Sequence, residues 1–334
     1  MDVALVIDKI DQNDIEKIEY IKNLIKIKNV KYIISTENKD SDLPDYIKKK
    51  ISNEKDIKVD TIHFIGVEAL LNFKLDIKCK KIITVFDLKT FKDESITEKI
   101  ESVINKKNFK SAIENIDLVI ANSTQLRDEL IDLINANPAN ITVINPGVEK
   151  LNNLNLKKDG TIGYFGEFGR YERVNKLIDD FISSALSNKI KLIIYGYVCK
   201  NYLKIKQKYE KFGNVIFKDG INYNEMEKTI NKFDYFVYPA EYSGFGLQLL
   251  ECLSCEILCF VYEDAKIPDE VIKYAVKIKK IDDIISFNLD ELNKNIKEYS
   301  KNIKDEFSTE KFIKAINNIY SSLDEKNNNL QSSL

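Results

Sequence analysis

Short apolar runs alternate with longer amphipathic segments along the whole chain. In the first half the runs lie at 3–7, 32–35, 62–65, 82–86, 118–121 and 141–144. In the second half they lie at 162–165, 192–195, 215–217, 235–238 and 258–262. They are rich in β-branched residues, which is typical of strands buried on both faces of a parallel sheet. The segments between them, such as 15–25, repeat apolar residues with the helical period. The pattern therefore predicts an α/β protein made of doubly wound sheets.

A change in composition divides this pattern into two halves. The turn sequence Asn145-Pro146-Gly147 is followed by a polar stretch at 150–159, before a new strand begins at Thr161. A chain of 334 residues also exceeds the usual size of a single core. We expect Rossmann-like domains at 1–150 and 151–305, a C-terminal helix within 306–325, and a flexible tail at 326–334.

Charge and hydropathy exclude several classes of function. The net charge of -2 gives no basic field for binding nucleic acid. No apolar run approaches the roughly 20 residues that span a bilayer, and the chain starts without a signal-peptide pattern, so we expect a cytoplasmic protein. One histidine and five cysteines without paired zinc spacing predict neither a metal site nor a cofactor.

Candidate chemistry is concentrated in the segment Tyr238-Pro-Ala-Glu-Tyr-Ser-Gly-Phe-Gly-Leu247. A strand ends there, a glycine loop follows, and an apolar helix begins. Because Gly244 and Gly246 lack a Cβ, backbone amides can approach an anion, and the helix N-terminus favours a diphosphate. The alternative is an ordinary turn whose glycines serve only the bend.

This segment resembles the donor-site motif of family 4 glycosyltransferases, which have the GT-B fold. The resemblance implies two Rossmann-like domains facing a central cleft, with the acceptor on the N-terminal domain. It also implies donor binding by the loop residues Ser243, Gly244, Phe245, Gly246 and Leu247, with Glu251 holding the ribose. Ser243 replaces the first glutamate of the family's E-x(7)-E motif, and Glu241 is a candidate substitute.

The resemblance covers about two thirds of the chain. Gly163-Tyr-Phe-Gly166 is similar to the first strand of the family's C-terminal domain, with Gly166 at the donor. Phe307-Ser308, with Tyr320, resembles the terminal helix that packs back on the N-terminal domain.

Two basic residues normally follow that strand in the family and clamp the donor diphosphate. An ungapped alignment places Glu167 and Glu172 there, which would repel a diphosphate. A gapped alignment brings in Arg170 and Arg173, two of only three arginines in the chain, and we interpret these as the catalytic pair. The alternative is that both arginines pair with the two glutamates at the surface.

His63 and Asp87 are candidate cleft residues of the N-terminal half. Both lie near positions where the family places donor-sugar contacts, although Phe86 stands where a histidine is usual.

The resemblance implies transfer of a hexose from a nucleoside diphosphate sugar, with retention, to an acceptor glycan, lipid or protein. The departures around the donor motif leave open a non-catalytic subunit that binds a partner transferase or the acceptor. A peripheral membrane surface is a further candidate partner. A nucleotide-sugar epimerase is a third hypothesis with the same architecture.

Overall fold

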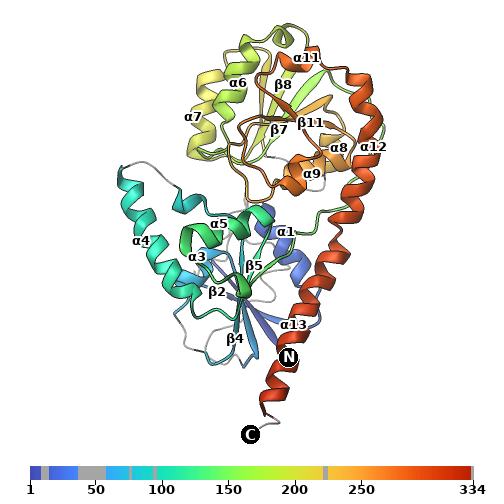
Figure 1. The fold of residues 1–334 in the computed structure, drawn as a ribbon. Helices are drawn as coiled ribbons and strands as arrows, with labels where there is room; N and C mark the ends of the chain where they lie inside the picture. Colours follow the sequence, from blue (N-terminus) through green and yellow to red (C-terminus); the bar gives the residue numbers. More distant parts are fainter. Residues whose placement is uncertain (9–14, 37–57, 75–76, 93–95, 221–224, 332–334) are drawn as a thin grey trace. The chain divides into compact units, whose positions relative to one another are not determined.

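The computed structural model describes residues 1–8, 15–36, 58–74, 77–92, 96–220 and 225–331, which form two units (Figure 1). Unit 1 comprises Met1–Gly147 with Thr309–Leu334, and unit 2 comprises Val148–Ser308. The division lies three residues from the boundary at 150 that the sequence pattern predicted. Among the described residues, no helix combines the length and apolarity needed to cross a membrane.

Unit 1 is built on a parallel sheet with the strand order β2-β1-β3-β4-β5-β6. The strands are β1 Val3–Ile7, β2 Val30–Ser35, β3 Thr61–Ile65, β4 Lys80–Val85, β5 Leu118–Ala121 and β6 Ile141–Val143. The helices are α1 Ile15–Leu24, α3 Val67–Asn72, α4 Ile96–Ile113, α5 Thr124–Ile134 and α13 Thr309–Gln331, with 3₁₀ turns at Lys89–Phe91 and Pro138–Asn140. Every residue of β1 and β3 is buried, which requires helices on both faces of the sheet.

Helices cover the two faces of this sheet with separate apolar clusters. On one face, α1 and α13 contribute Tyr20, Ile21, Ile316 and Tyr320. On the other face, α3, α4 and α5 contribute a second cluster that includes Phe109. Figure 1 shows these two groups of helices on opposite sides of the strands.

The terminal helix α13 is longer than the sequence pattern predicted. It runs to Gln331, whereas the pattern predicted a helix within 306–325 and a flexible tail from 326. The stretch 309–331 contains neither glycine nor proline, so no residue forces the helix to stop, despite its asparagines and serines.

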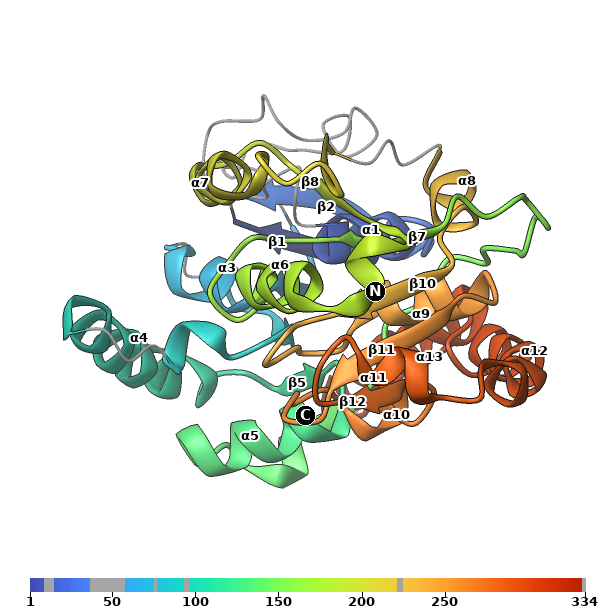
Figure 2. The same ribbon diagram turned by 90° about the horizontal axis from the view of Figure 1, so that it is seen from above.

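Unit 2 repeats the architecture with the strand order β12-β11-β10-β7-β8-β9, again parallel. The strands are β7 Thr161–Phe165, β8 Lys191–Gly196, β9 Val215–Asp219, β10 Tyr235–Tyr238, β11 Leu258–Tyr262 and β12 Val276–Ile278. The helices are α6 Val174–Ser183, α7 Lys200–Tyr209, α8 Met226–Ile230, α9 Leu247–Ser254, α10 Asp269–Ile272, α11 Asp283–Ser286 and α12 Leu289–Glu306, with a 3₁₀ turn at Ala185–Asn188. Figure 2 shows α6 and α7 on one side of this sheet, and α9 and α12 on the other.

The strand order of unit 2 determines where a ligand can bind. The chain proceeds from β7 to β8 and β9 on one side, and then returns to place β10 on the other side of β7. Loops after β7 and β10 therefore diverge at the carboxyl edge of the sheet, where open α/β sheets bind their ligands.

Candidate functional site

The glycine loop after β10 has the strand–loop–helix geometry that the sequence predicted. β10 ends at Tyr238, and α9 begins at Leu247. Gly246 adopts φ 93° at the N-cap of α9, a left-handed conformation that favours glycine. No side chain of a described residue caps this helix, and the amide of Leu249 donates to Gly246 O at 3.1 Å. A helix N-terminus of this kind favours an anion.

The loop after β7 meets the beginning of α9. Gly166 has φ 151°, and a Cβ there would lie 3.1 Å from Tyr164 Oη and 3.7 Å from Gln248 Nε2. Tyr164 Oη donates to the carbonyl of Glu167 at 2.6 Å, which fixes the start of the loop. The structure therefore brings Gly166 together with the first turn of α9.

Backbone hydrogen bonds fix the first half of the glycine loop between two neighbouring segments. The amide of Glu241 donates to Tyr171 O at 2.7 Å, and the amide of Lys266 donates to Glu241 O at 2.7 Å. The amide of Ser243 donates to Lys266 O at 3.0 Å. The amides of Glu241 and Ser243 are thus bonded within the protein, which fixes the first half of the loop.

The side chains expected to bind the donor differ in exposure. Glu241 is exposed, whereas Ser243 is 7% exposed and accepts a hydrogen bond from Tyr238 Oη at 3.3 Å. Phe245 is fully buried, and its ring packs edge-on against Phe307 at 5.5 Å. Phe245 therefore has a packing role, and only its backbone can serve a ligand at the loop.

Glu251 lies one turn after Leu247 on α9, and both side chains are buried.

Burial, together with the nearby charges of Glu227 and Glu251, raises the pKa of the Cys255 thiol to about 12. This thiol is therefore protonated at neutral pH. Among the residues that the structure describes, no group of three or more acidic, histidine or cysteine side chains is placed to hold a metal ion.

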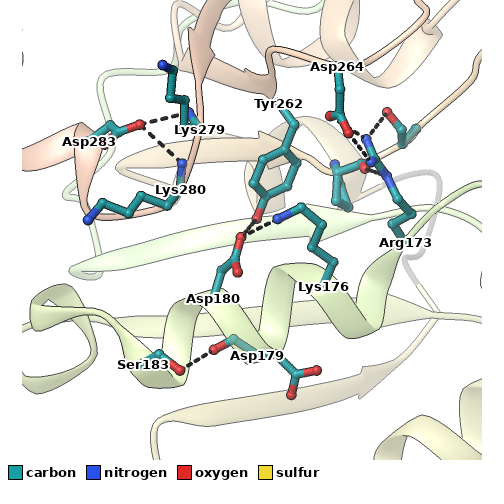
Figure 3. A network of polar contacts seen from close by, with 12 residues as sticks. Arg173, Lys176, Asp179, Asp180, Ser183, Tyr262, Asp264, Lys279, Lys280 and Asp283 are labelled. Atoms are coloured by element: carbon teal, nitrogen blue, oxygen red, sulfur yellow. Dashed lines mark hydrogen bonds and ion pairs between the residues drawn. The ribbon is translucent and has the colours of Figure 1, made fainter.

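Arg173, which the sequence interpretation assigned to a phosphate clamp, has its guanidinium hydrogen-bonded within unit 2. Its Nη1 and Nη2 donate to the two oxygens of Asp264 at 2.7 and 3.0 Å, and Nε donates to Pro239 O at 3.1 Å (Figure 3). Nη2 also lies 3.5 Å from the carbonyl of Ala240. The guanidinium thus joins the first residues of the glycine loop to the segment after β11.

Asp264 was not anticipated, because it lies 91 residues from Arg173 in the sequence. The adjacent arginine holds the pKa of the Asp264 carboxyl below its usual value, since the ionised form is stabilised by both hydrogen bonds and charge. The available signal was an acidic residue two positions after a buried strand, but this signal did not identify Arg173 as the partner.

A second set of contacts extends the same network along α6. Tyr262 Oη donates to Asp180 Oδ2 at 2.7 Å, and Lys176 Nζ donates to the same oxygen at 2.8 Å (Figure 3). The Lys176 ammonium also lies 4.1 Å from the centre of the Tyr262 ring. Tyr262 ends β11, so these contacts fix α6 against the strand that leads to Asp264.

Arg170 is exposed, with its guanidinium carbon 5.8 Å from the centre of the Tyr171 ring. Glu172 is only 6% exposed, and its Oε2 would lie 2.4 Å from a Cβ at Gly169. Burial, together with the charge of Glu172, keeps the pKa of Tyr164 well above its usual value. Of the two predicted arginines, Arg170 alone presents its side chain at the surface.

His63, a candidate cleft residue from the sequence, lies in the interior of unit 1. It is fully buried, with Nδ1 2.8 Å from Tyr320 Oη and Nε2 2.7 Å from Thr84 Oγ1. Burial lowers the pKa of His63 to about 3, so the ring is neutral. The histidine joins β3 to α13 within unit 1. Asp87, by contrast, lines a pocket at the end of β4.

Comparisons with known proteins agree with this geometry. Residues 149–305 match the family described as "Glycosyl transferases group 1". No curated protein matches the sequence.

Solved structures match both units. Sucrose-phosphate synthase from Thermosynechococcus elongatus superposes with a TM-score of 0.74 at 14% identity, over 98% of this chain and 100% of that chain. HepE from Anabaena, solved with UDP and glucose, gives 0.75 at 12% identity, over 96% and 100%. TarM of S. aureus gives 0.63 at 18% identity, over 78% of this chain and 54% of that one. The chain therefore has the GT-B fold, and its C-terminal unit belongs to the group 1 glycosyltransferase family.

Proposed function

We propose that the protein transfers a sugar, with retention, from a nucleoside diphosphate donor bound on unit 2 to a separate acceptor. The observation that carries this proposal is the meeting of Gly166 with the uncapped N-terminus of α9 at the switch point of the sheet. A diphosphate at this point would accept hydrogen bonds from amides of the first turn, where the helix dipole favours negative charge.

The reaction would depend on positioning and on stabilisation of the leaving diphosphate. Arg170 is an exposed cation in the loop after β7, and it would neutralise charge as the glycosidic bond breaks. Glu251 would accept hydrogen bonds from the ribose hydroxyls. Arg173 would instead position the glycine loop through its bonds to Pro239 and Asp264.

A thermal-shift panel of nucleoside diphosphates and nucleotide sugars tests donor binding, because a ligand that binds only the folded state raises its melting temperature. Release of nucleoside diphosphate then tests turnover. We expect Arg170→Ala to retain the melting temperature of the free protein and lose most of the ligand-induced shift. Arg127→Ala is a matched control, because Arg127 is bonded to Asp128 on unit 1. Equal shifts in all three proteins would contradict the role of Arg170.

A non-catalytic binding subunit is the second candidate, and one observation favours it. Glu167 and Glu172 flank the loop after β7, and the adjacent Arg173 is already neutralised by Asp264. The local charge is therefore poorly suited to a diphosphate. Stable association with a partner transferase, without any donor-induced shift in melting temperature, would favour this candidate over the first.

A further inference from the structure

Helix α7 differs in charge from the rest of the chain. It contains no acidic residue and four lysines, Lys200, Lys204, Lys206 and Lys208, while Glu210 and Lys211 directly after it offset each other. The whole chain, by contrast, has 51 basic and 53 acidic residues. The longer helix α12 carries four lysines and five acidic residues. The abundance of lysine in the chain therefore does not by itself explain a helix with only positive charges.

One side of α7 is fixed to the core of unit 2. Tyr202, Ile205 and Tyr209 are buried. The Tyr202 ring lies edge-on to Phe168 at 5.0 Å, and the amide of Tyr202 donates to Cys199 Sγ at 3.4 Å at the N-cap. Figure 1 shows α7 at the outer edge of unit 2. These contacts determine which side of the helix faces solvent.

The solvent side of α7 is a stripe formed by Lys200, Leu203, Lys204 and Gln207, all of which are exposed. These positions lie three or four residues apart, so they share one face of the helix. Among the described residues, no acidic side chain pairs with Lys200 or Lys204. Lys200 is also the first residue of the helix, where the macrodipole disfavours a cation, so helix stability does not explain its charge.

The two lysines beside this stripe neutralise the nearby acidic residues. Lys206 Nζ donates to Asp219 Oδ1 at 3.1 Å, and Lys208 Nζ lies 3.9 Å from Asp179 Oδ2. Because these carboxylates already have cationic partners, they do not offset the charges of the stripe.

Two apolar side chains lie at the start of α7. Val198 is 60% exposed and Leu203 is 51% exposed. They occupy the position before the N-cap and the fourth position of the helix, which are the positions that pack together in a hydrophobic staple. Exposed apolar residues combined with lysines are typical of helices that lie in the interfacial region of a bilayer.

The shape and charge of this face favour a lipid surface over a protein partner. A protein that binds an amphipathic helix needs a complementary groove, whereas a bilayer takes up projecting side chains between its headgroups. Anionic headgroups also attract lysines close to the surface, and each lysine contributes about fivefold in affinity.

We propose that Val198, Lys200, Leu203 and Lys204 form a docking face that holds unit 2 on a bilayer containing anionic lipids. Lys200 and Lys204 bind the anionic headgroups, while Val198 and Leu203 enter the boundary between headgroups and acyl chains. The proposal does not depend on the proposed transfer of a sugar.

Co-sedimentation of the full chain with vesicles tests the docking face. One set of vesicles contains phosphatidylcholine alone, and the other contains equal parts of phosphatidylcholine and phosphatidylglycerol. The main variant is Lys200→Gln/Lys204→Gln. The matched control is Lys297→Gln/Lys301→Gln, which removes an exposed pair with the same spacing from α12 and changes the net charge equally. Leu203→Ser tests the apolar component, and the melting temperature of each variant shows that it is folded.

We expect the natural protein to bind the anionic vesicles, to leave the phosphatidylcholine vesicles unbound, and to dissociate at high salt. Lys200→Gln/Lys204→Gln should bind the anionic vesicles about thirtyfold more weakly, and Leu203→Ser about fivefold more weakly. Lys297→Gln/Lys301→Gln should bind like the natural protein.

Absence of binding to the anionic vesicles would overturn the proposal, as would binding that salt does not weaken. An equal loss of binding in the α12 control would also overturn it, because net charge rather than position would then be responsible. Soluble polyglutamate serves as a probe for an acidic protein partner, and its binding without vesicle binding would assign the face to such a partner instead.

Discussion

Arg173 and Asp264 provide the most direct test of how the glycine loop is held. Replacing Arg173 with alanine removes two charge-assisted bonds to Asp264 and one bond to Pro239 O. The Arg173 side chain is 15% exposed and that of Asp264 is 60% exposed, so we assign about 0.5–1 kcal/mol to the screened ion pair. The shielded bond to Pro239 O adds about 1.5 kcal/mol. The sum of about 2 kcal/mol corresponds to a fall of about 5 °C in the melting temperature of unit 2.

Backbone conformation adds a second, separable effect. Arg173 has φ 46°, which costs a residue with a Cβ about 1 kcal/mol relative to glycine. Arg173→Gly should therefore be about 1 kcal/mol more stable than Arg173→Ala in urea unfolding. Equal stability of the two variants would show that the left-handed conformation carries no strain.

Asp264→Asn distinguishes a positioning role from direct phosphate binding. If Arg173 positions the loop, this variant lowers donor affinity in the same direction as Arg173→Ala, and the double variant is no worse than Arg173→Ala alone. If Arg173 bound the phosphate directly, removing its competing carboxylate would raise donor affinity. Isothermal titration calorimetry, with the nucleotide that raises the melting temperature, measures the donor affinity of the single and double variants. A gain in affinity in Asp264→Asn would refute the positioning role.

The stabilisation that the Arg173–Asp264 ion pair provides should also depend on pH in a defined direction. Arg173 lowers the pKa of Asp264 below its ordinary value of 3.8, so the stabilisation is present above that value and is lost as pH falls through the lowered pKa. The difference in stability between the natural protein and Asp264→Asn should accordingly shrink in this acidic range.

Three further perturbations test other parts of the structure. The pKa of His63 is about 3 in the folded protein and 6.5 in the unfolded chain. Between these values only the unfolded chain binds the proton, so lowering the pH from 6.5 to 5 should reduce the free energy of unfolding by about 2 kcal/mol. His63→Gln should lose this component in urea titrations at the two pH values, and an unchanged slope would contradict the burial argument. Gly163→Ala places a Cβ 2.3 Å from the Phe233 ring and should cost about 2 kcal/mol, whereas Gly213→Ala, with no atom within 4 Å, should be nearly neutral in the same denaturation assay. Glu251→Gln should weaken donor binding about tenfold by calorimetry if the carboxylate holds the ribose, and unchanged affinity would exclude that role.

The strands were predictable because burial on both faces produces continuous apolar runs. β1, β5, β10 and β11 have the same bounds in the structure as in the sequence pattern. The edge strand β12 was missed, because it has only three residues and Lys277 interrupts its apolar pattern. The turn into α9 was also predictable, since its glycines mark the conformation locally.

The partners of the charged side chains were not predictable from local patterns. The two arginines near β7 looked equivalent in the sequence, but Arg173 lies at the N-cap of α6, where it meets the loops after β10 and β11. That meeting depends on the order β11-β10-β7 in the sheet, which no single segment encodes. The partner of His63 was not predictable for a related reason, because Tyr320 lies 257 residues away in sequence.

The return of α13 to unit 1 has a consequence for synthesis on the ribosome. Phe312, Ile316, Tyr320 and Leu323 complete a cluster whose other buried members lie in the first half of the chain. The part of the protein that is made first is therefore finished last, whereas Val148–Ser308 is continuous and can fold as soon as it emerges. Until α13 is made, unit 1 exposes the part of this apolar face that α13 covers, which makes that interval an aggregation-prone stage of its biogenesis.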